Sequence, residues 1–399
     1  MLILEWTIAI FKKIVLQHTV GLNMKSIVSC KKKLSYIQLR FSTIISLKMC
    51  FRSEKMEKLY VVTPLFNPLG YKSRHKLYNN FEKHMLKTKN IVLCTVECVF
   101  KGNTPTVRKK GKNHIVVTVE SLDKFWFKEN LINIGVSRLP KEAKYICWID
   151  ADLKFPDPNW ASNTIELLKK YPVIQMFSEV DYIDHDGITI VRKVPSLMDG
   201  WLNGAYILNN GKRCSNPKVL GDSNKKYGWH GAPGGAWAYR KEIFEKIGGL
   251  VDFGIVGSGD SYSAFGMLGI VCSSVLSNSF KYNPDYVKAV KDWVDNAFKV
   301  VDGNIGVLDC IIYHNYHGET KDRQYWERNE ILCKNQFSPK GDLYKNHQGL
   351  NQFIQGKPEL EADIIKYFEN RKEDNNYDDS EDSNTSEGKF LGWIKRIIK

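Results

Sequence analysis

The stretch Tyr145-Ile146-Cys147-Trp148-Ile149-Asp150-Ala151-Asp152-Leu153 decides the fold class. Its first five residues are apolar, which is typical of a buried parallel strand, and two carboxylates follow where that strand ends. Because a carboxylate is costly to bury without partners, we expect Asp150 and Asp152 at the sheet edge, where open α/β sheets bind ligands. Two hard oxygen ligands suit Mg²⁺ or Mn²⁺. The plainer alternative is a pair of loop or helix-capping carboxylates.

Strands and helices alternate on both sides of this stretch. We expect strands at residues 59–63, 91–96, 115–119, 144–149 and 173–178, and helices at 71–87, 127–138 and 159–171. This alternation predicts an α/β fold with a doubly wound, mostly parallel sheet flanked by helices. After a turn signal at 184–187 the pattern becomes irregular and rich in Gly, Trp and Tyr. We interpret residues 187–320 as an irregular substrate-facing half, followed by a helix at 322–334.

Composition and charge limit the class of protein. The chain has 399 residues and a net charge of +14, of which residues 1–55 carry +8 and residues 369–399 carry −2. The remaining +8 lies on the body, which suits anionic ligands such as nucleotide diphosphates. No zinc-finger spacing, Arg-rich helix or RNA-binding aromatic pattern occurs, so we expect no nucleic-acid partner. Nine scattered cysteines without a C-x-x-C pair favour a reduced, cytoplasmic environment.

The two ends of the chain differ from its body. Residues 1–55 are basic and almost free of acidic residues, and we expect them to lie outside the fold, with Met56 as a candidate start. We expect a helical end at 351–368 and an acidic disordered linker at 369–388. Residues 389–399 (KFLGWIKRIIK) place apolar residues on one helical stripe, which is typical of a weak membrane-surface contact. Docking to a protein partner is the alternative for this segment.

Four further clusters place polar groups at expected strand ends or loops. They are the turn with Thr63, Pro64 and Asn67, the Gly- and Trp-rich segment 229–240 with Trp229 and Trp237, the loop 257–261 with Asp260, and the segment 311–323 with His314, His317, Lys321 and Arg323. Trp faces suit stacking on sugar rings, and an Asp in a pocket can act as a general base. Imidazoles beside a carboxylate favour Mn²⁺, and the cations can bind a diphosphate. The plainer readings are a packed turn, a helix cap and structural histidines.

In this order the motifs resemble those of a GT-A-fold glycosyltransferase, most closely the family-2-like enzymes of phages and giant viruses. The motifs are a strand ending in T-P-x-x-N, the D-x-D, the Gly/Trp segment, a G-x-G-D helix start and an H-x-x-H-G-x-x-x-D-R segment. The resemblance implies a GT-A domain at residues 56–350. Its nucleotide-binding half would be 56–185, and its acceptor-binding and metal-completing half would be 186–350.

The resemblance also implies roles for individual residues. Asp152 and Asp150, with His317 or His314, would bind the metal ion. Asp260 would be the catalytic base, although the family's usual acidic pair reads Gly259-Asp260 here. The nucleotide-sugar contacts would be Thr63, Pro64, Asn67, Glu97, Lys128, Asn130, Asp150, Trp237, Lys321 and Arg323.

The activity implied by the resemblance is that of a hexosyltransferase that depends on Mn²⁺ or Mg²⁺. It would move a sugar from a UDP-linked donor to a saccharide or protein hydroxyl, with inversion if Asp260 is the base, in the cytoplasm (of the host if viral). One alternative is a nucleotidyltransferase that makes activated sugars, but the loop at 66–71 has one glycine and no cation. The other is a non-catalytic carbohydrate-binding protein of the same fold, but both metal carboxylates are present.

Overall fold

The computed structural model describes residues 57–202, 206–209, 212–215, 231–277 and 279–375. The chain divides into two compact units, Met1–Glu57 and Lys58–Lys399, and the described elements belong to the second. The expectations for residues 1–55, for Trp229, and for the segment 389–399 lie outside the described residues and stay predictions.

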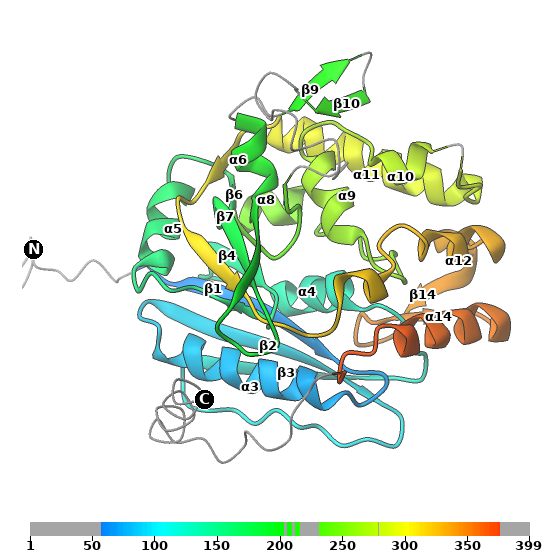
Figure 1. Cartoon of the computed structure of the whole chain (residues 1–399), viewed down its shortest axis with the longest axis horizontal. Coiled ribbons are helices and arrows are strands. Elements are labelled where there is room, and N and C mark those ends of the chain that lie inside the picture. The colour runs from blue at the N-terminus through cyan, green and yellow to red at the C-terminus, as the bar shows by residue number, and fades with distance from the viewer. Residues whose placement is uncertain (1–56, 203–205, 210–211, 216–230, 278, 376–399) are drawn as a thin grey trace, which may run out of the picture. The chain divides into compact units, whose positions relative to one another are not determined.

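A seven-stranded sheet in the order β12-β6-β11-β4-β1-β2-β3 forms the centre of the second unit (Figure 1). Its neighbours are parallel except for β11, which runs antiparallel to both β4 and β6. This confirms the predicted mostly parallel α/β sheet. The strands are β1 (Leu59–Phe66), β2 (Ile91–Phe100), β3 (His114–Ser121), β4 (Tyr145–Ile149), β6 (Val173–Gln175), β11 (Ala236–Arg240) and β12 (Ile305–Val307).

Helices cover both faces of this sheet, because its strands are apolar on both sides. Successive residues of β1 point to opposite faces, so Val62 joins one hydrophobic core and Val61 the other. The Val62 core includes residues of α4 (Lys128–Ser137), α9 (Gly259–Gly266) and α11 (Pro284–Val301). The Val61 core includes residues of α3 (Lys72–Lys87) and α5 (Trp160–Leu168).

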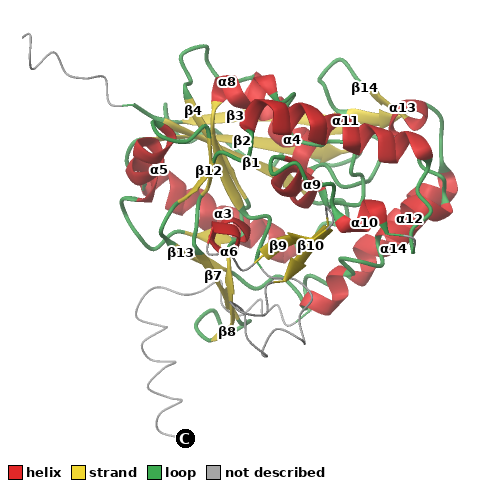
Figure 2. Ribbon diagram, turned by 90° about the horizontal axis from the view of Figure 1, so that it is seen from above, coloured by secondary structure: helices red, strands yellow, loops and turns green. Residues whose placement is uncertain are grey.

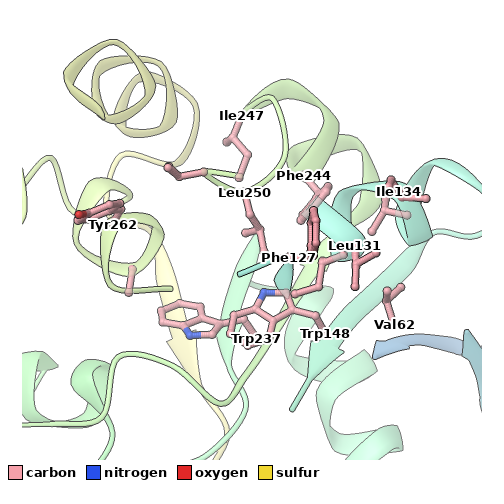
Figure 3. Packing of buried hydrophobic residues seen from close by; sticks show 14 of the residues in the cluster. Val62, Phe127, Leu131, Ile134, Trp148, Trp237, Phe244, Ile247, Leu250 and Tyr262 are labelled. Atoms are coloured by element: carbon pink, nitrogen blue, oxygen red, sulfur yellow. The ribbon is translucent and has the colours of Figure 1, made fainter. Parts of the chain in front are cut away.

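Close packing in the Val62 core positions α4 against the sheet (Figure 3). A Cβ on Gly135 of α4 would overlap the side chains of Val62 and Val96, so glycine lets the helix approach β1 and β2. Phe127, at the start of α4, is fully buried, and burial of such a side chain stabilises the fold by roughly 1.5–3 kcal/mol. The first residues of α4 are thereby held at the end of β4.

A second sheet of four strands, in the order β5-β13-β7-β8, lies beyond the end of β4. Figure 2 shows β7, β8 and β13 on one side of the molecule and α10, α12 and α14 on the other. The bounds are β5 (Leu153–Lys154), β7 (Glu179–Ile183), β8 (Ile190–Pro195) and β13 (Ile311–His314). The remaining elements are α6 (Leu197–Leu202), β9 (Tyr206–Asn209), β10 (Lys212–Ser215), α8 (Lys241–Lys246), α10 (Ser273–Leu276), η2 (Thr320–Arg323), α12 (Asn329–Lys334), α13 (Pro339–Asp342), β14 (Leu343–Lys345), β15 (Asn351–Phe353) and α14 (Pro358–Asn370). Within the described residues, no helix is long and apolar enough to cross a membrane.

The C-terminal half is more regular than the sequence predicted. Helix α11 has 18 residues and begins with a proline at its first turn. The side chain of Asn283 caps it by accepting a hydrogen bond from the backbone of Asp285 at 2.9 Å. The predicted helix at 322–334 is instead broken into η2 and α12, because Gln324 between them is left-handed with φ of +46°.

The acidic linker also begins later than expected. Helix α14 continues to Asn370, and the next residues remain in the fold. Arg371 and Glu373 are 3% and 2% exposed, and their side chains pair with each other. The prediction of a linker starting at residue 369 was therefore wrong for 369–375, because a buried ion pair fixes this stretch.

Candidate active site

A cavity of about 670 Å³ opens where β1 and β4 end. Its wall includes the backbone of Gly234 and Gly235 before β11 and side chains from β7, β13, α9 and α12. Several predicted site residues line it together: Pro64, Lys128, Asp150, Asp152, Asp260, His314, His317 and Arg323. The sheet edge therefore brings together groups that are far apart in the sequence.

Asp152, His314 and His317 form a compact cluster in this cavity. One ligand atom from each lies within 4.8 Å of the others. Nε2 of His317 is 2.8 Å from Oδ2 of Asp152, and Nε2 of His314 is 3.9 Å from the same oxygen. Pairing of β13 with β5 places His314 beside Leu153, the residue that directly follows Asp152. The imidazole of His314 therefore lies next to the D-x-D.

Backbone contacts fix this geometry. The backbone N–H and the side-chain amide of Asn315 each donate to the carbonyl oxygen of Asp152, both at 2.9 Å. The chain after β13 is therefore attached to the chain after β4. His317 follows Asn315 by two residues, which explains how a residue from the other half of the chain reaches Asp152.

The charges of the cluster suit a divalent metal ion. Burial alone would raise the pKa of Asp152, but His314, His317 and Arg323 lower it well below its usual range. Burial lowers the pKa of His314 to about 3 and also lowers that of His317, which favours the neutral form of the imidazole that binds metal ions. Oδ1 of Asp152 is buried without a hydrogen-bond partner among the described residues. One carboxylate and two neutral imidazoles fit a divalent ion such as Mn²⁺.

Lys128 joins the D-x-D to the first turn of α9. Its Nζ lies 2.7 Å from Oδ2 of Asp150 and 3.5 Å from Oδ2 of Asp260. Burial lowers the pKa of Lys128, but Asp150, Asp260 and Glu129 outweigh this and raise it. The carboxylate of Asp150 is thus engaged by a cation, and the three-residue metal cluster does not include it. This separates the roles of the two D-x-D carboxylates.

Asp260 reaches the cavity from the first turn of α9. A Cβ on Gly234 would overlap the Asp260 carboxylate, so the glycine provides the space that this side chain occupies. Burial would raise the pKa of Asp260, but Lys128 and Arg328 lower it below its usual value. Arg328 is held there by a 2.9 Å hydrogen bond to the hydroxyl of Ser258. Asp260 is therefore an ionised carboxylate at the cavity wall.

Glu129 is a cavity residue that the sequence did not reveal. It is 3% exposed, and a Cβ on Gly259 would overlap its side chain, so it lies against the residue before Asp260. Burial raises the pKa of Glu129 to about 8, with a further contribution from the charge of Asp260. Glu129 consequently holds a proton at neutral pH. No local signal marked it, because a Glu in the first turn of a helix is ordinary.

Three predicted nucleotide contacts at strand ends have partners within the protein. The hydroxyl of Thr63 donates to the carbonyl of Ile149 at 2.9 Å. The side chain of Asn67 exchanges two hydrogen bonds, of 2.8 and 2.9 Å, with the backbone of Tyr71. Glu97 accepts hydrogen bonds from the backbone N–H groups of Thr106 and Val107. In the described part of the chain, none of the three lines the cavity.

Three further predicted contacts are also absent from the wall formed by the described residues. Asn130 is buried and bonds to Asp252 and to the backbone of Asn351, at 3.1 and 2.8 Å. Trp237 lies in the Val62 core, with its indole N–H donating to Pro233 (Figure 3). The predicted sugar-stacking role of Trp237 is therefore wrong, because alternation along β11 turns its ring inward. Lys321 in η2 does not line the cavity either.

Arginines from the C-terminal elements complete the wall. Arg328 and Arg371 line the cavity together with Arg74 of α3. Glu373 pairs with both Arg74 and Arg371, the latter at 2.6 Å. Sequence reasoning missed all three arginines, because only the packing of α12 and α14 brings two of them here.

Comparisons with known proteins give distant similarities. No protein-family model matches the chain, and no curated protein sequence matches it significantly. The catalytic domain of Drosophila beta1,4-galactosyltransferase 7 with xylobiose is similar, with 17% identity, 52% of this chain and 60% of that chain covered, and a TM-score of 0.27. The structure of GalNAc-T7 with UDP, GalNAc and Mn²⁺ has 13% identity and a TM-score of 0.37, and the match covers 66% of this chain and 45% of that chain. The 4-diphosphocytidyl-2C-methyl-D-erythritol synthase of Anaerococcus prevotii has 12% identity and a TM-score of 0.29, and the match covers 64% of this chain and 87% of that chain.

Proposed function

We propose that this protein is a metal-dependent glycosyltransferase that moves a sugar from a nucleoside-diphosphate sugar to a hydroxyl acceptor. The observation that supports it most is the meeting of three groups in one cavity: the Asp152–His314–His317 cluster, the cations Lys128 and Arg323, and the carboxylate of Asp260. A site that must hold a diphosphate and deprotonate a hydroxyl needs these three components.

The residues of the cavity divide the chemistry between them. A divalent ion held by Asp152, His314 and His317 would neutralise negative charge on the leaving nucleoside diphosphate. Arg323 presents a guanidinium beside that cluster and can bind phosphate oxygens. Lys128 contacts Asp150 and Asp260 and orients both side chains. Its charge lowers the pKa of Asp260 below the usual value, whereas burial still raises the pKa of Asp150 to about 7.

Asp260 is the proposed base. Its carboxylate would take the proton of the acceptor hydroxyl as the oxygen attacks the anomeric carbon, and such a reaction inverts the configuration of the sugar. The pKa of Asp260 is low, so the group is ready to accept a proton at neutral pH. The transition state should resemble an oxocarbenium ion, as in glycoside hydrolysis.

The finer assignments belong to the same proposal. The mixed nitrogen and oxygen ligands favour Mn²⁺ over Mg²⁺. A UDP-linked hexose donor, a saccharide or protein acceptor, and kinship with the family-2-like enzymes of phages and giant viruses stay predictions.

Donor screening tests the proposal. Nucleotide sugars should raise the melting temperature of the protein more strongly with Mn²⁺ than without it, because ligands that bind the folded state stabilise it. Asp152→Ala should abolish Mn²⁺-dependent hydrolysis of the stabilising donor, whereas Asp295→Ala on the exposed side of α11 should not. Release of pyrophosphate from a nucleoside triphosphate and a sugar phosphate would instead indicate a nucleotidyltransferase. Binding of saccharides without turnover would indicate a carbohydrate-binding protein.

A further inference from the structure

A surface that does not line the cavity carries many cations and almost no acid. It is formed by the C-terminal part of α3 with the turn that follows it, and by residues 101–113, and we call it the basic face. Seven exposed side chains define it: Lys83, Lys87, Lys89, Lys101, Arg108, Lys109 and Lys112. The only acidic residue in these two stretches is Glu82, which is 2% exposed and pairs with Lys110. The exposed charge of the face is therefore entirely positive.

Residues 101–113 connect two parallel strands without a crossover helix. They leave β2 and run back beside α3 to the start of β3 (Figure 1). Parallel neighbours are usually joined by a helix, so an irregular connection of this kind needs other means of fixing its backbone. Glu97 supplies one, since its carboxylate accepts from the N–H and hydroxyl of Thr106 at 2.8 and 2.6 Å and from the N–H of Val107 at 3.1 Å.

A second set of contacts fixes the other end of the connection. The backbone of Lys110 donates to the ring of His114 at 3.2 Å, and its ammonium group pairs with Glu82 of α3. Val107 packs against Tyr78 of α3. The backbone is thus held against α3 while the neighbouring cationic side chains point to solvent. Binding a partner here costs little backbone ordering, because the fold has already fixed this stretch.

The positive charges of the basic face have no acidic partner among the residues that the structure describes. In residues 57–375, as far as the structure describes them, none of the seven side chains forms an ion pair, and none lines the cavity. Like charges gathered on one surface repel one another and destabilise the folded state. A surface of this kind is expected where a polyanionic partner binds.

We propose that the basic face binds an anionic lipid surface. Lysine near a membrane of anionic lipids contributes attraction without needing a shaped pocket, and six of the seven cations are lysines. Nucleic-acid recognition instead favours bidentate arginines and aromatic stacking, and the segment at 101–113 has one arginine and no aromatic residue. The composition of the face therefore favours lipid.

The path of the chain supports the same partner. Asp374 accepts hydrogen bonds from the backbone N–H groups of Lys72 and Ser73, so the chain passes the N-terminus of α3 just before residue 376. Thirteen residues, 376–388, separate this point from the basic, apolar-striped sequence 389–399. They can span at most about 45 Å, which exceeds the roughly 24 Å length of α3. The basic face and residues 389–399 can therefore contact the same membrane. Two weak membrane contacts together give stable binding.

Vesicle co-sedimentation tests this inference independently of any activity. The full chain is mixed with phosphatidylcholine vesicles with or without phosphatidylserine, at low and high salt. Arg108→Gln, Lys109→Gln and Lys112→Gln are combined in one variant, which spares the Lys110–Glu82 pair. The matched control combines Lys246→Gln, Lys291→Gln and Lys299→Gln on α8 and α11, which are also exposed. Thermal melts of both variants show whether they fold as the wild type does.

We expect the wild type to bind phosphatidylserine vesicles and to lose this binding at high salt. The variant of the basic face should bind them at least roughly tenfold more weakly, and the control should bind nearly as the wild type does. Equal binding by the two variants would overturn the inference, and so would equal binding to vesicles without phosphatidylserine. Binding of duplex DNA without binding of phosphatidylserine vesicles would assign the face to nucleic acid instead.

Discussion

Nε2 of His317 lies 2.8 Å from Oδ2 of Asp152, which joins the chain after β13 to the chain after β4. The contact exists because Asn315 binds the backbone carbonyl of Asp152 through two donors. Two segments from different halves of the chain thus form one site, in which the partly exposed carboxylate of Asp152 faces two imidazoles. The proposed metal site and the proposed activity both depend on this arrangement.

Asp260→Asn separates binding from chemistry. The substitution keeps the size of the side chain but removes its ability to take a proton, so transfer should fall by at least roughly a hundredfold. Binding of Mn²⁺ and of the donor should change little, because the metal cluster is formed by other residues. Single-turnover transfer and calorimetric donor binding are the two measurements. If transfer continues at the wild-type rate, the base lies elsewhere and inversion loses its support.

Lys128→Met should destabilise the protein. Lys128 is 5% exposed, and without its charge the partly exposed carboxylates of Asp150 and Asp260 lose their cation. Breaking a fully buried pair costs about 3–5 kcal/mol, and the partial exposure of both carboxylates puts the expected loss at the lower end of that range. Urea unfolding measures the loss. Lys288→Met is the control, since its pair with Asp292 on α11 is exposed and should matter much less. Equal effects of the two substitutions would contradict a structural role for the Lys128 pair.

Glu129→Gln should change how stability depends on pH. The pKa of Glu129 is raised to about 8 from its ordinary value of 4.5, so the folded state binds a proton that the unfolded state releases. Wild-type stability should therefore fall as pH rises between these values, by at most about 1.4 kcal/mol per pH unit from this group. Glutamine cannot titrate, so the free energy of unfolding of the variant should increase relative to that of the wild type as pH rises.

Urea unfolding at several pH values across this window measures the difference between Glu129→Gln and wild type. Glu120→Gln on the exposed side of β3 provides the baseline. A pH-independent difference would show that Glu129 is ionised in the folded state.

Glu373→Gln tests whether the stretch after α14 belongs to the fold. Burial raises the pKa of Glu373, but Arg74 and Arg371 outweigh it and hold that pKa well below its usual range. The stability contribution of the ionised pair is therefore complete above about pH 4.5 and is lost progressively as pH falls from there through the lower folded value. Glutamine should cost about 3 kcal/mol at neutral pH, because it leaves Arg371 buried without its counter-ion. Glu369→Gln, which is exposed, should cost far less; equal losses would contradict the assignment.

The elements that the sequence predicted well are those with a local signal. The apolar run before Asp150 predicted β4, and its abrupt polar end predicted the sheet-edge position of both carboxylates. The imidazoles at 314 and 317 were predicted for the same reason, since they too follow an apolar run. In each case the residues that decide the structure are neighbours in the sequence.

The failures have a common cause. Thr63 and Glu97 lie within β1 and β2, which run further than predicted, and Asn67 follows β1. Their polar groups bind backbone of the protein, and no sequence pattern distinguishes such a group from one that faces a ligand. Glu129 and Arg371 reach the cavity through the packing of α4 and α14. Contacts of that kind depend on tertiary structure, which a single sequence does not display.

Titration of Mn²⁺ into the full chain by calorimetry tests the central claim most directly. We expect a single Mn²⁺ site in the wild type, and Asp152→Asn should weaken it by more than roughly tenfold, because the substitution removes the charged ligand of the Asp152–His314–His317 cluster. Asp295→Asn should leave the affinity unchanged. If the Asp152→Asn variant folds and binds Mn²⁺ as tightly as the wild type, the cluster is not the metal site and the account is wrong.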